Sequence, residues 1–401
     1  MLAAPFDIRI EFMRTLLSFF VLPFVLPFLV ATTAAQSPSP TPAPSSSPQS
    51  QDRPTLNRPG SSNPAPSPAA SPAPSPTPSP SPSSSSAAES AQAGAEYPKV
   101  SYPDLLPRFD YDSRAGLAMR ETDVHKRGNI RLIELNYAGA SGDRVPAYLL
   151  IPPGGGPFPA IIWGHWLMKS SPLANKDEFM EEAVALAHSG VVSLLIDAPQ
   201  ARNDWVEAKG GFLESVKQQS EAAVHQVTDL RRGVDLLYGR PDVDRHRIGY
   251  VGHSWDAHVG AILAGVETRI SSYVLMASGY SDEEETFASN DPARMARIKE
   301  VGEDNVHNYF REYAWDDPVY FLGHTDREGI FLQFASADPI SKDLAQKYLD
   351  RFSAKDKKME FYNAPHALNA AARLDRDRWL QKHLSIKKID EKELGEIEQL
   401  K

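Results

Sequence analysis

Apolar runs alternate with amphipathic segments through most of the chain after residue 140. A short apolar run bounded by turn residues is typical of a strand that is buried on both faces of a sheet. Strands are predicted at 144–152, 159–166, 191–197, 247–254, 271–278, 329–336 and 358–363. Segments with helical spacing lie between or after them, at 181–190, 255–265, 341–352 and 367–384.

A further, long amphipathic helix is predicted before Pro241. Its apolar side chains share one face of the helix: Val216, Ala223, Val227, Leu230, Val234 and Leu237. Strands that alternate with helices indicate a mostly parallel central sheet with helices on both faces. Ligands of such sheets bind at the carboxyl ends of the strands. The predicted fold class is therefore α/β, and strand ends are the places to look for functional residues.

A helical insert is predicted at 280–324, before the strand at 329–336. One interpretation is a cover over the functional site, and the equal alternative is a packed helical excursion. The residues predicted to form its apolar underside are Met295, Ile298, Val301, Val306 and Phe310.

The N-terminal segment 1–35 is interpreted as a signal peptide. Arg14 precedes an apolar run from Leu16 to Val30, and small residues follow that run. Met13 is then a candidate for the true start of the chain. The alternative is an uncleaved N-terminal anchor, although this run is short for a bilayer span.

The remaining chain divides by composition. Residues 36–95 hold 16 of the 34 prolines and almost no large apolar residue, so this Pro/Ser/Ala-rich segment is predicted to be a disordered linker. A folded domain is predicted at 96–384, and a charged helical tail at 385–401.

The net charge of −10 lies in the folded part, because the charges of the first 95 residues cancel. An acidic globule without a basic stripe argues against binding to nucleic acid or to anionic membrane surfaces. A membrane is then contacted only through an uncleaved N-terminal segment. The chain has no cysteine, which excludes disulfides, thiol catalysis and cysteine-based zinc sites.

Ser254 stands between a predicted strand and a predicted helix, two residues after Gly252. A strand, a sharp turn with serine at its tip and a helix directly behind it form a nucleophile elbow. The backbone N–H groups at the start of that helix face a developing oxyanion. The usual motif has a glycine where this chain has Asp256, so the aspartate needs room of its own. Ser254 is predicted to be a nucleophile, and a structural serine is the alternative.

A serine nucleophile needs a base, and the base needs an orienting carboxylate. Asp338 follows the strand at 329–336, and His366 follows the strand at 358–363. With Ser254 they keep the order serine, acid, histidine that is typical of chains with this elbow. Weaker candidates lie in charged helical stretches or turns: His307, His324, His383 and the reserve acid Asp282.

The segments "VTDLRRGVDLLYGRPDVDRHRIGYVGHSWDAHVGAILAG", "FASADPIS" and "NAPHALN" carry a family resemblance. The chain resembles the α/β-hydrolase superfamily, and within it the group that contains dienelactone hydrolases, acetyl esterases and the catalytic domains of prolyl-oligopeptidase-like enzymes. The similarity covers about Arg144 to Leu384. It implies that Ser254 is the nucleophile, His366 the general base and Asp338 the acid that orients the base.

The resemblance also implies an oxyanion hole. One donor is the backbone N–H of Trp255. The other lies in the loop "GHWLM", where His165 matches the family's histidine and Trp166 replaces its glycine. The second donor is then Leu167 or, less favoured, Trp166. His165, Trp166 and Trp255 are also predicted to border the substrate pocket, with packing as an equal alternative for the two tryptophans.

These features predict an exported serine hydrolase, periplasmic, at the cell surface or secreted, that acts on a small-molecule or glycan-linked ester and needs no cofactor or metal. An acetyl esterase or a dienelactone hydrolase-like enzyme fits best. A prolyl-oligopeptidase-like peptidase is an alternative, but the residues before the first clear strand, 96–143, are too few for that group's propeller. A non-catalytic binding protein is the other alternative. The sequence leaves the oligomeric state open.

Overall fold

The structure, a computed structural model, describes residues 100–398 apart from 210–211, 279–281, 289–291 and 326–328. The predicted signal peptide or anchor and the predicted linker lie outside the described residues. Within the described ranges, no helix combines the length and the apolar character that crossing a bilayer requires.

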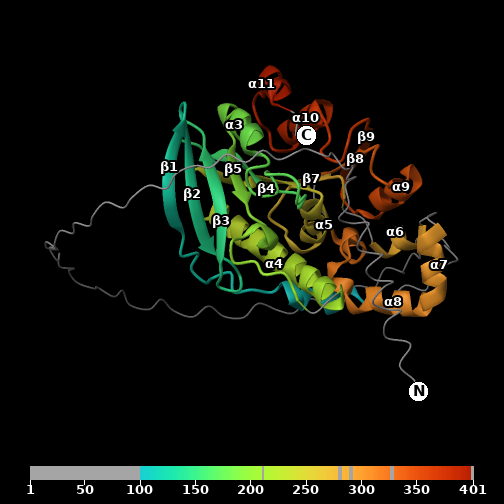
Figure 1. Ribbon diagram of the computed structural model, residues 1–401. Helices are drawn as coiled ribbons and strands as arrows, with labels where there is room; N and C mark the ends of the chain where they lie inside the picture. The colour runs from blue at the N-terminus through green and yellow to red at the C-terminus, as the bar shows by residue number, and fades with distance from the viewer. Residues whose placement is uncertain (1–99, 210–211, 279–281, 289–291, 326–328, 399–401) are drawn as a thin grey trace, which may run out of the picture. The chain divides into compact units, whose positions relative to one another are not determined.

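In the described part of the chain, nine strands form one sheet in the order β1-β2-β3-β5-β4-β6-β7-β8-β9 (Figure 1). The strands are β1 Arg120–Arg127, β2 Ile130–Ala138, β3 Arg144–Ile151, β4 Phe158–Gly164, β5 Val192–Ile196, β6 Val243–His253, β7 Ser272–Met276, β8 Gly329–Ala335 and β9 Asp356–Tyr362. The pairs from β5 to β9 are parallel, and the pairs that join β1, β2, β3 and β5 are antiparallel.

Helices cover both faces of this sheet (Figure 1). Their bounds are α2 Tyr102–Leu105, α3 Met180–His188, α4 Phe212–Tyr238, α5 Trp255–Val266, α6 Asp282–Ala288, α7 Pro292–Val301, α8 Glu303–Glu312, α9 Lys342–Arg351, α10 Ala370–His383 and α11 Glu391–Glu396. Short 3-10 helices lie at 106–109, 199–201, 314–316, 318–320 and 322–324. The predicted α/β class, with a mostly parallel sheet and helices on both faces, is confirmed.

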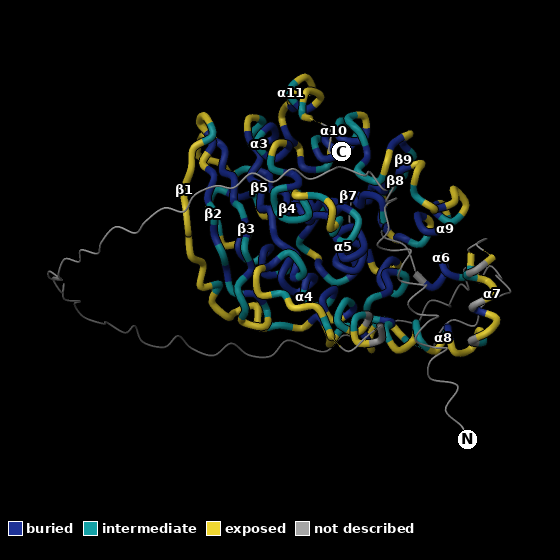
Figure 2. Tube along the Cα trace, viewed as in Figure 1, coloured by how far each residue is buried: buried dark blue, intermediate teal, exposed yellow. Residues whose placement is uncertain are grey.

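Two apolar cores lie against the two faces of the sheet. Successive strand residues point to opposite faces, so in β4 Ile162 joins the core of α4, α5 and α9, whereas Ile161 and Trp163 join the core of α3, α10 and α11. Burial on both faces explains why the central strands are continuous apolar runs in the sequence. Figure 2 shows this buried centre.

The expectation that the first strand begins at Arg144 is wrong. An antiparallel hairpin, β1 and β2, precedes it and pairs with β3 at one edge of the sheet. Seven of the eight residues of β1 are exposed, and its sequence "RETDVHKR" carries no apolar alternation. Charged side chains on an edge strand discourage pairing with other chains, and they also hide the strand from a search for apolar runs.

The insert before β8 is helical, as predicted, and consists of α6, α7, α8 and the 3-10 helices that follow them. Ile298 and Val306 are buried in it, in agreement with an apolar underside. Met295 is 42% exposed and does not belong to that underside. Phe310 is half-buried, and the side chain of Val301 lies outside the described set.

The C-terminal tail differs from the charged helix predicted for 385–401. Only α11 is helical in its described part, and residues 384–390 connect it to α10 without a helix. Ile386, Ile389 and Leu394 are buried in the core of α3 and α10. The tail therefore contributes apolar side chains to the domain, a role that its charged composition concealed.

Candidate active site

Ser254 lies at the tip of a sharp turn between β6 and α5. Its backbone has φ 53° and ψ −106°, a conformation that is strained for any residue with a Cβ atom. Its amide donates to the carbonyl of Met276 at 2.8 Å, and its carbonyl accepts from the amides of Ala257 and His258, both at 3.1 Å. A strained serine between a strand and a helix is the geometry of a nucleophile elbow.

Gly252 permits this turn to be tight. A Cβ atom at Gly252 would lie 2.2 Å from the carbonyl oxygen of Asp256. No side chain fits in that space, so the approach of β6 to the first turn of α5 requires glycine here.

The structure brings together the three side chains that the sequence singles out. The hydroxyl of Ser254 lies 2.8 Å from Nε2 of His366, and Nδ1 of His366 lies 2.9 Å from Oδ1 of Asp338. An ionised carboxylate only accepts hydrogen bonds, so Nδ1–H donates to Asp338 and Nε2 is free to accept from the serine. The side chain of His366 is 32% exposed. This arrangement can deprotonate the serine hydroxyl at a place that a substrate reaches.

The weaker histidine candidates contact other partners. His307 pairs with Glu283 inside the insert, and His383 lies 3.3 Å from Asp356. The ring of His324 stacks on Tyr102. The side chain of Asp282, the reserve acid, lies outside the described set.

The candidate oxyanion donors come from two places in the chain, the start of α5 and the loop after β4. Trp255 is the first residue of α5, where backbone N–H groups have no partner within the helix. The amide of Trp166 donates to Oε2 of Glu178 at 2.7 Å, so it is already engaged. Leu167, the next residue in the loop after β4, is therefore the better second donor.

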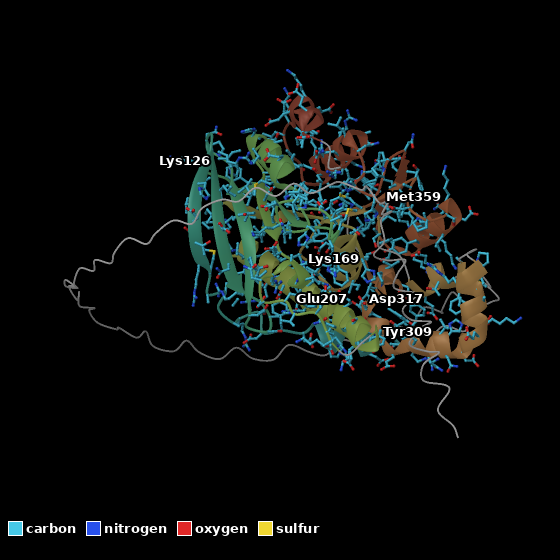
Figure 3. All side chains as sticks on the ribbon, in the orientation of Figure 1. Lys126, Lys169, Glu207, Tyr309, Asp317 and Met359 are labelled. Carbon is cyan, nitrogen blue, oxygen red and sulfur yellow. The ribbon has the colours of Figure 1, made fainter. Side chains whose placement is uncertain are left out.

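The loop after β4 is held at its surface as well. Lys169 of this loop pairs with Glu207 at 2.5 Å, and both side chains are largely exposed (Figure 3). An exposed ion pair contributes little to stability. The buried bond between Trp166 and Glu178 is the stronger restraint on the loop.

Two solved structures of similar architecture are acetyl xylan esterases. One from Paenibacillus sp. R4 has a TM-score of 0.55 and 13% identity, over 70% of this chain and 93% of that chain. Acetyl xylan esterase 1 from Thermoanaerobacterium sp. JW/SL YS485 has a TM-score of 0.55 and 14% identity, over 73% of this chain and 95% of that chain. No family model and no curated protein matches the chain.

The chain has the α/β-hydrolase fold. In an α/β hydrolase the functional residues follow the carboxyl ends of the parallel strands. Here Ser254 follows β6, Asp338 follows β8 and His366 follows β9. Three residues that are far apart in the chain thus meet at one edge of the sheet.

Asp256 is fully buried behind the serine turn. Its room comes from Gly164 at the end of β4, where a Cβ atom would lie 2.5 Å from Cγ of Asp256. Gln226 donates to Oδ1 of the aspartate at 3.0 Å. Burial raises the pKa of Asp256 to about 6; nearby His165 and the Gln226 bond oppose this rise, and Glu178 adds to it.

His165 and Trp166, predicted to border the pocket, lie in the interior. His165 accepts from the amide of Ala198 at 2.9 Å, so its other ring nitrogen, 2.7 Å from the carbonyl of Trp166, donates to that carbonyl. Both residues are 1% exposed. They shape the loop after β4 and offer no surface to a substrate in this conformation. Trp255 is half-buried and stacks on His258, so it stays the candidate pocket residue of the three.

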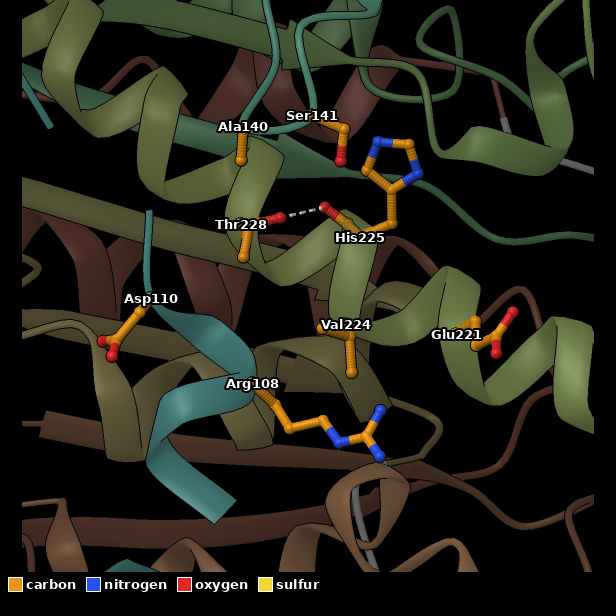
Figure 4. Close-up of a pocket in the computed structure, with 8 residues that line it drawn as sticks. All are labelled: Arg108, Asp110, Ala140, Ser141, Glu221, Val224, His225 and Thr228. Carbon is orange, nitrogen blue, oxygen red and sulfur yellow. Dashed lines mark hydrogen bonds between the residues drawn. The ribbon is translucent and has the colours of Figure 1, made fainter. Parts of the chain in front are cut away.

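A second polar cluster lies beside a hollow of 320 Å³ that is lined by residues of α4 and of the loops before β1 and β3 (Figure 4). Asp143, His225 and Asp229 approach one another there at distances suited to a metal ion. The guanidinium of Arg202, however, binds Asp143 at 2.7 Å and Asp229 at 2.6 Å. Because a cation already occupies both carboxylates, the cluster is an ion-pair network and a poor metal site.

Proposed function

We propose that this protein is a serine hydrolase that cleaves carboxylic esters through an acyl-enzyme. The observation that carries the proposal is the pair of contacts made by His366, 2.8 Å to the Ser254 hydroxyl and 2.9 Å to Asp338. A base within hydrogen-bond reach of a serine, oriented by a carboxylate, is the requirement for nucleophilic catalysis.

In the proposed reaction, Ser254 attacks the ester carbonyl carbon while Nε2 of His366 takes its proton. Asp338 fixes the ring and stabilises the imidazolium. The oxyanion accepts hydrogen bonds from the backbone N–H groups of Trp255 and Leu167; loss of one such donor costs about 3 kcal/mol of transition-state stabilisation. The imidazolium returns the proton to the leaving alcohol. A water molecule, deprotonated by His366, then releases the acid and restores the serine.

One argument favours esters over other substrates. The solved structures of similar architecture that are described above are acetyl xylan esterases. Acetyl or other short acyl esters of glycans or small molecules are the substrate class we propose.

The proposal includes export, and this part rests on the sequence alone. The apolar run in residues 1–35, with Arg14 before it and small residues after it, is the signal we propose. Expression of the full chain in a bacterial host, followed by N-terminal sequencing of the exported fraction, tests it. Protein that stays in the cytoplasm with residue 1 or 13 at its N-terminus would contradict export.

A fluorophosphonate probe tests the catalytic proposal. The wild type should become labelled, and Ser254→Ala should not. Ser336→Ala is the matched control, since Ser336 is exposed and also follows β8 at the same edge of the sheet; it should label like the wild type. Absence of labelling in a folded wild type would refute the proposal and favour a binding protein.

Substrate assays then separate ester from peptide hydrolysis. Nitrophenyl acetate and butyrate should be hydrolysed, and dipeptide anilides should not. The reverse result would assign the site to a peptidase.

A further inference from the structure

A buried histidine–carboxylate pair lies directly behind the proposed catalytic residues. His253 precedes the serine, and its Nδ1 lies 2.5 Å from Oε1 of Glu178, in the turn that leads into α3. The side chains of His253 and Glu178 are 0% and 1% exposed. The reaction steps proposed above use neither residue.

The pair reaches two loops of the site. Nε2 of His253 lies 3.0 Å from the backbone carbonyl of His366. The second carboxylate oxygen of Glu178 accepts the amide of Trp166 at 2.7 Å. One buried unit therefore touches the base loop, the serine turn and the loop of the proposed oxyanion donor Leu167.

The hydrogen bonds of this unit determine where its protons lie. The carbonyl of His366 can only accept, so Nε2 of His253 carries a proton. The Trp166 amide can only donate, so Oε2 of Glu178 is unprotonated. One proton then lies between Nδ1 of His253 and Oε1 of Glu178. Each of the three contacts of this unit thus joins one donor to one acceptor. A fully matched buried network favours one geometry and resists change.

Aromatic stacking reinforces the same arrangement. The rings of His253, Trp166 and His366 contact one another in a triangle, with centroids 5.0 Å apart for His253 and Trp166, 5.3 Å for His253 and His366, and 6.4 Å for Trp166 and His366. Rotation of His253 would break both stacks as well as its hydrogen bonds. The imidazole of the proposed base thus rests on a ring whose orientation Glu178 fixes.

We propose that Glu178 is a positioning residue that, through His253 and the Trp166 amide, sets the place of the base loop relative to the oxyanion loop. This inference rests on the proposed esterase function. In this proposal Glu178, which does not belong to the Ser-His-Asp set, aligns the base and the oxyanion donor for the same transition state. A misplacement of about 1 Å in such an arrangement costs about 100-fold in rate.

Two substitutions at Glu178 separate the effect of its hydrogen bonds on positioning from the effect of its side-chain volume. Glu178→Gln keeps every bond, because the amide oxygen accepts from Trp166 and the amide N–H donates to a neutral His253. Glu178→Ala leaves the Trp166 amide and His253 Nδ1 unpaired. We expect kcat of E178A to fall about 10- to 100-fold with KM within about threefold, and E178Q to stay within about threefold of the wild type.

Glu182→Gln is the matched control. Glu182 is also a buried carboxylate, four residues further along, but it binds Arg376 of α10 and no residue of the site. E182Q should lower the urea midpoint and leave kcat per folded molecule unchanged. A purely structural role for Glu178 would give E178A that same pattern, lower stability with an unchanged kcat, and would overturn the proposal.

A second variant guards against a failure of E178A to fold. His253→Phe keeps a ring beside Trp166 and His366 and removes both hydrogen bonds of His253, so kcat should fall by a similar factor. A folded H253F with the kcat of the wild type overturns the inference. The wild-type reaction with the fluorophosphonate distinguishes the two levels: an unreactive wild type overturns the esterase and this inference together, whereas a reactive wild type with a fully active E178A overturns this inference alone.

Discussion

Asp256 makes the stability of the fold depend on pH in a direction opposite to that of most surface carboxylates. Its pKa is raised from 3.8 to about 6 by burial behind the serine turn. The folded state therefore holds a proton that the unfolded chain has released between these two values. Stability from this group is intact below pH 3.8 and is lost as the pH rises towards 6.

The size of the effect follows from the two values. A rise in pKa from 3.8 to about 6 corresponds to about 3 kcal/mol of lost stability once the pH is well above 6. Asp256→Asn removes the titration and keeps an oxygen that accepts from Gln226. Any packing cost of the amide is the same at every pH, so the pH-dependent part of the difference reports Asp256 alone.

Urea unfolding of wild type and D256N at about pH 4.5 and about pH 8 measures that part. The stability of D256N relative to the wild type should rise by about 2 kcal/mol between the two conditions, because the group is partly titrated at the lower pH. Groups that titrate in both proteins cancel in the comparison. A relative stability that is the same at both pH values would refute the assignment of Asp256 as a buried acid of raised pKa.

Two more substitutions test other parts of the fold. Arg376→Leu removes the hydrogen-bonded partner of the buried Glu182 carboxylate and leaves it only Arg373, at 3.6 Å; urea unfolding should show a loss of about 3 kcal/mol, and a loss below about 1 kcal/mol would mean that the ion pair is accessible to water. Leu394→Ala removes a side chain that is 1% exposed from the tail; it should cost about 2–4 kcal/mol, and a midpoint equal to that of the wild type would mean that the tail does not pack on the domain.

The sequence predicted those parts of the fold whose residues are almost all buried. The central strands are buried on both faces, so an apolar run was sufficient to locate them. Ser254 and Asp338 could be singled out because each follows such a strand, whereas His366 follows β9, a partly buried strand at the edge of the sheet, and was singled out by its order after the other two. That His366 bonds a residue 112 positions away was beyond any local pattern; the order of strands in the sheet brings the two together.

Other features left no local signal. Strand β1 is an exposed edge whose composition matches a loop, and the pairing that makes it a strand comes from β2. Glu178 lies in a turn without periodicity, and only its distance to His253 reveals its role. The one hint in the sequence was His253 itself, a polar residue at the end of the buried second half of β6, where burial requires a partner.

The side chain of Asp256 occupies the space that a Cβ atom at Gly164 would need, and this has a consequence for how the site evolves. Many nucleophile elbows place the glycine on the helix, at the position of Asp256; here the glycine stands on the neighbouring strand, and the side chain fills the gap from the other direction. A larger residue at position 164 alone would clash with Asp256, and a smaller residue at position 256 alone would leave a cavity. Among homologous chains the residues at these two positions should covary, and only a few combinations of residue types should occur.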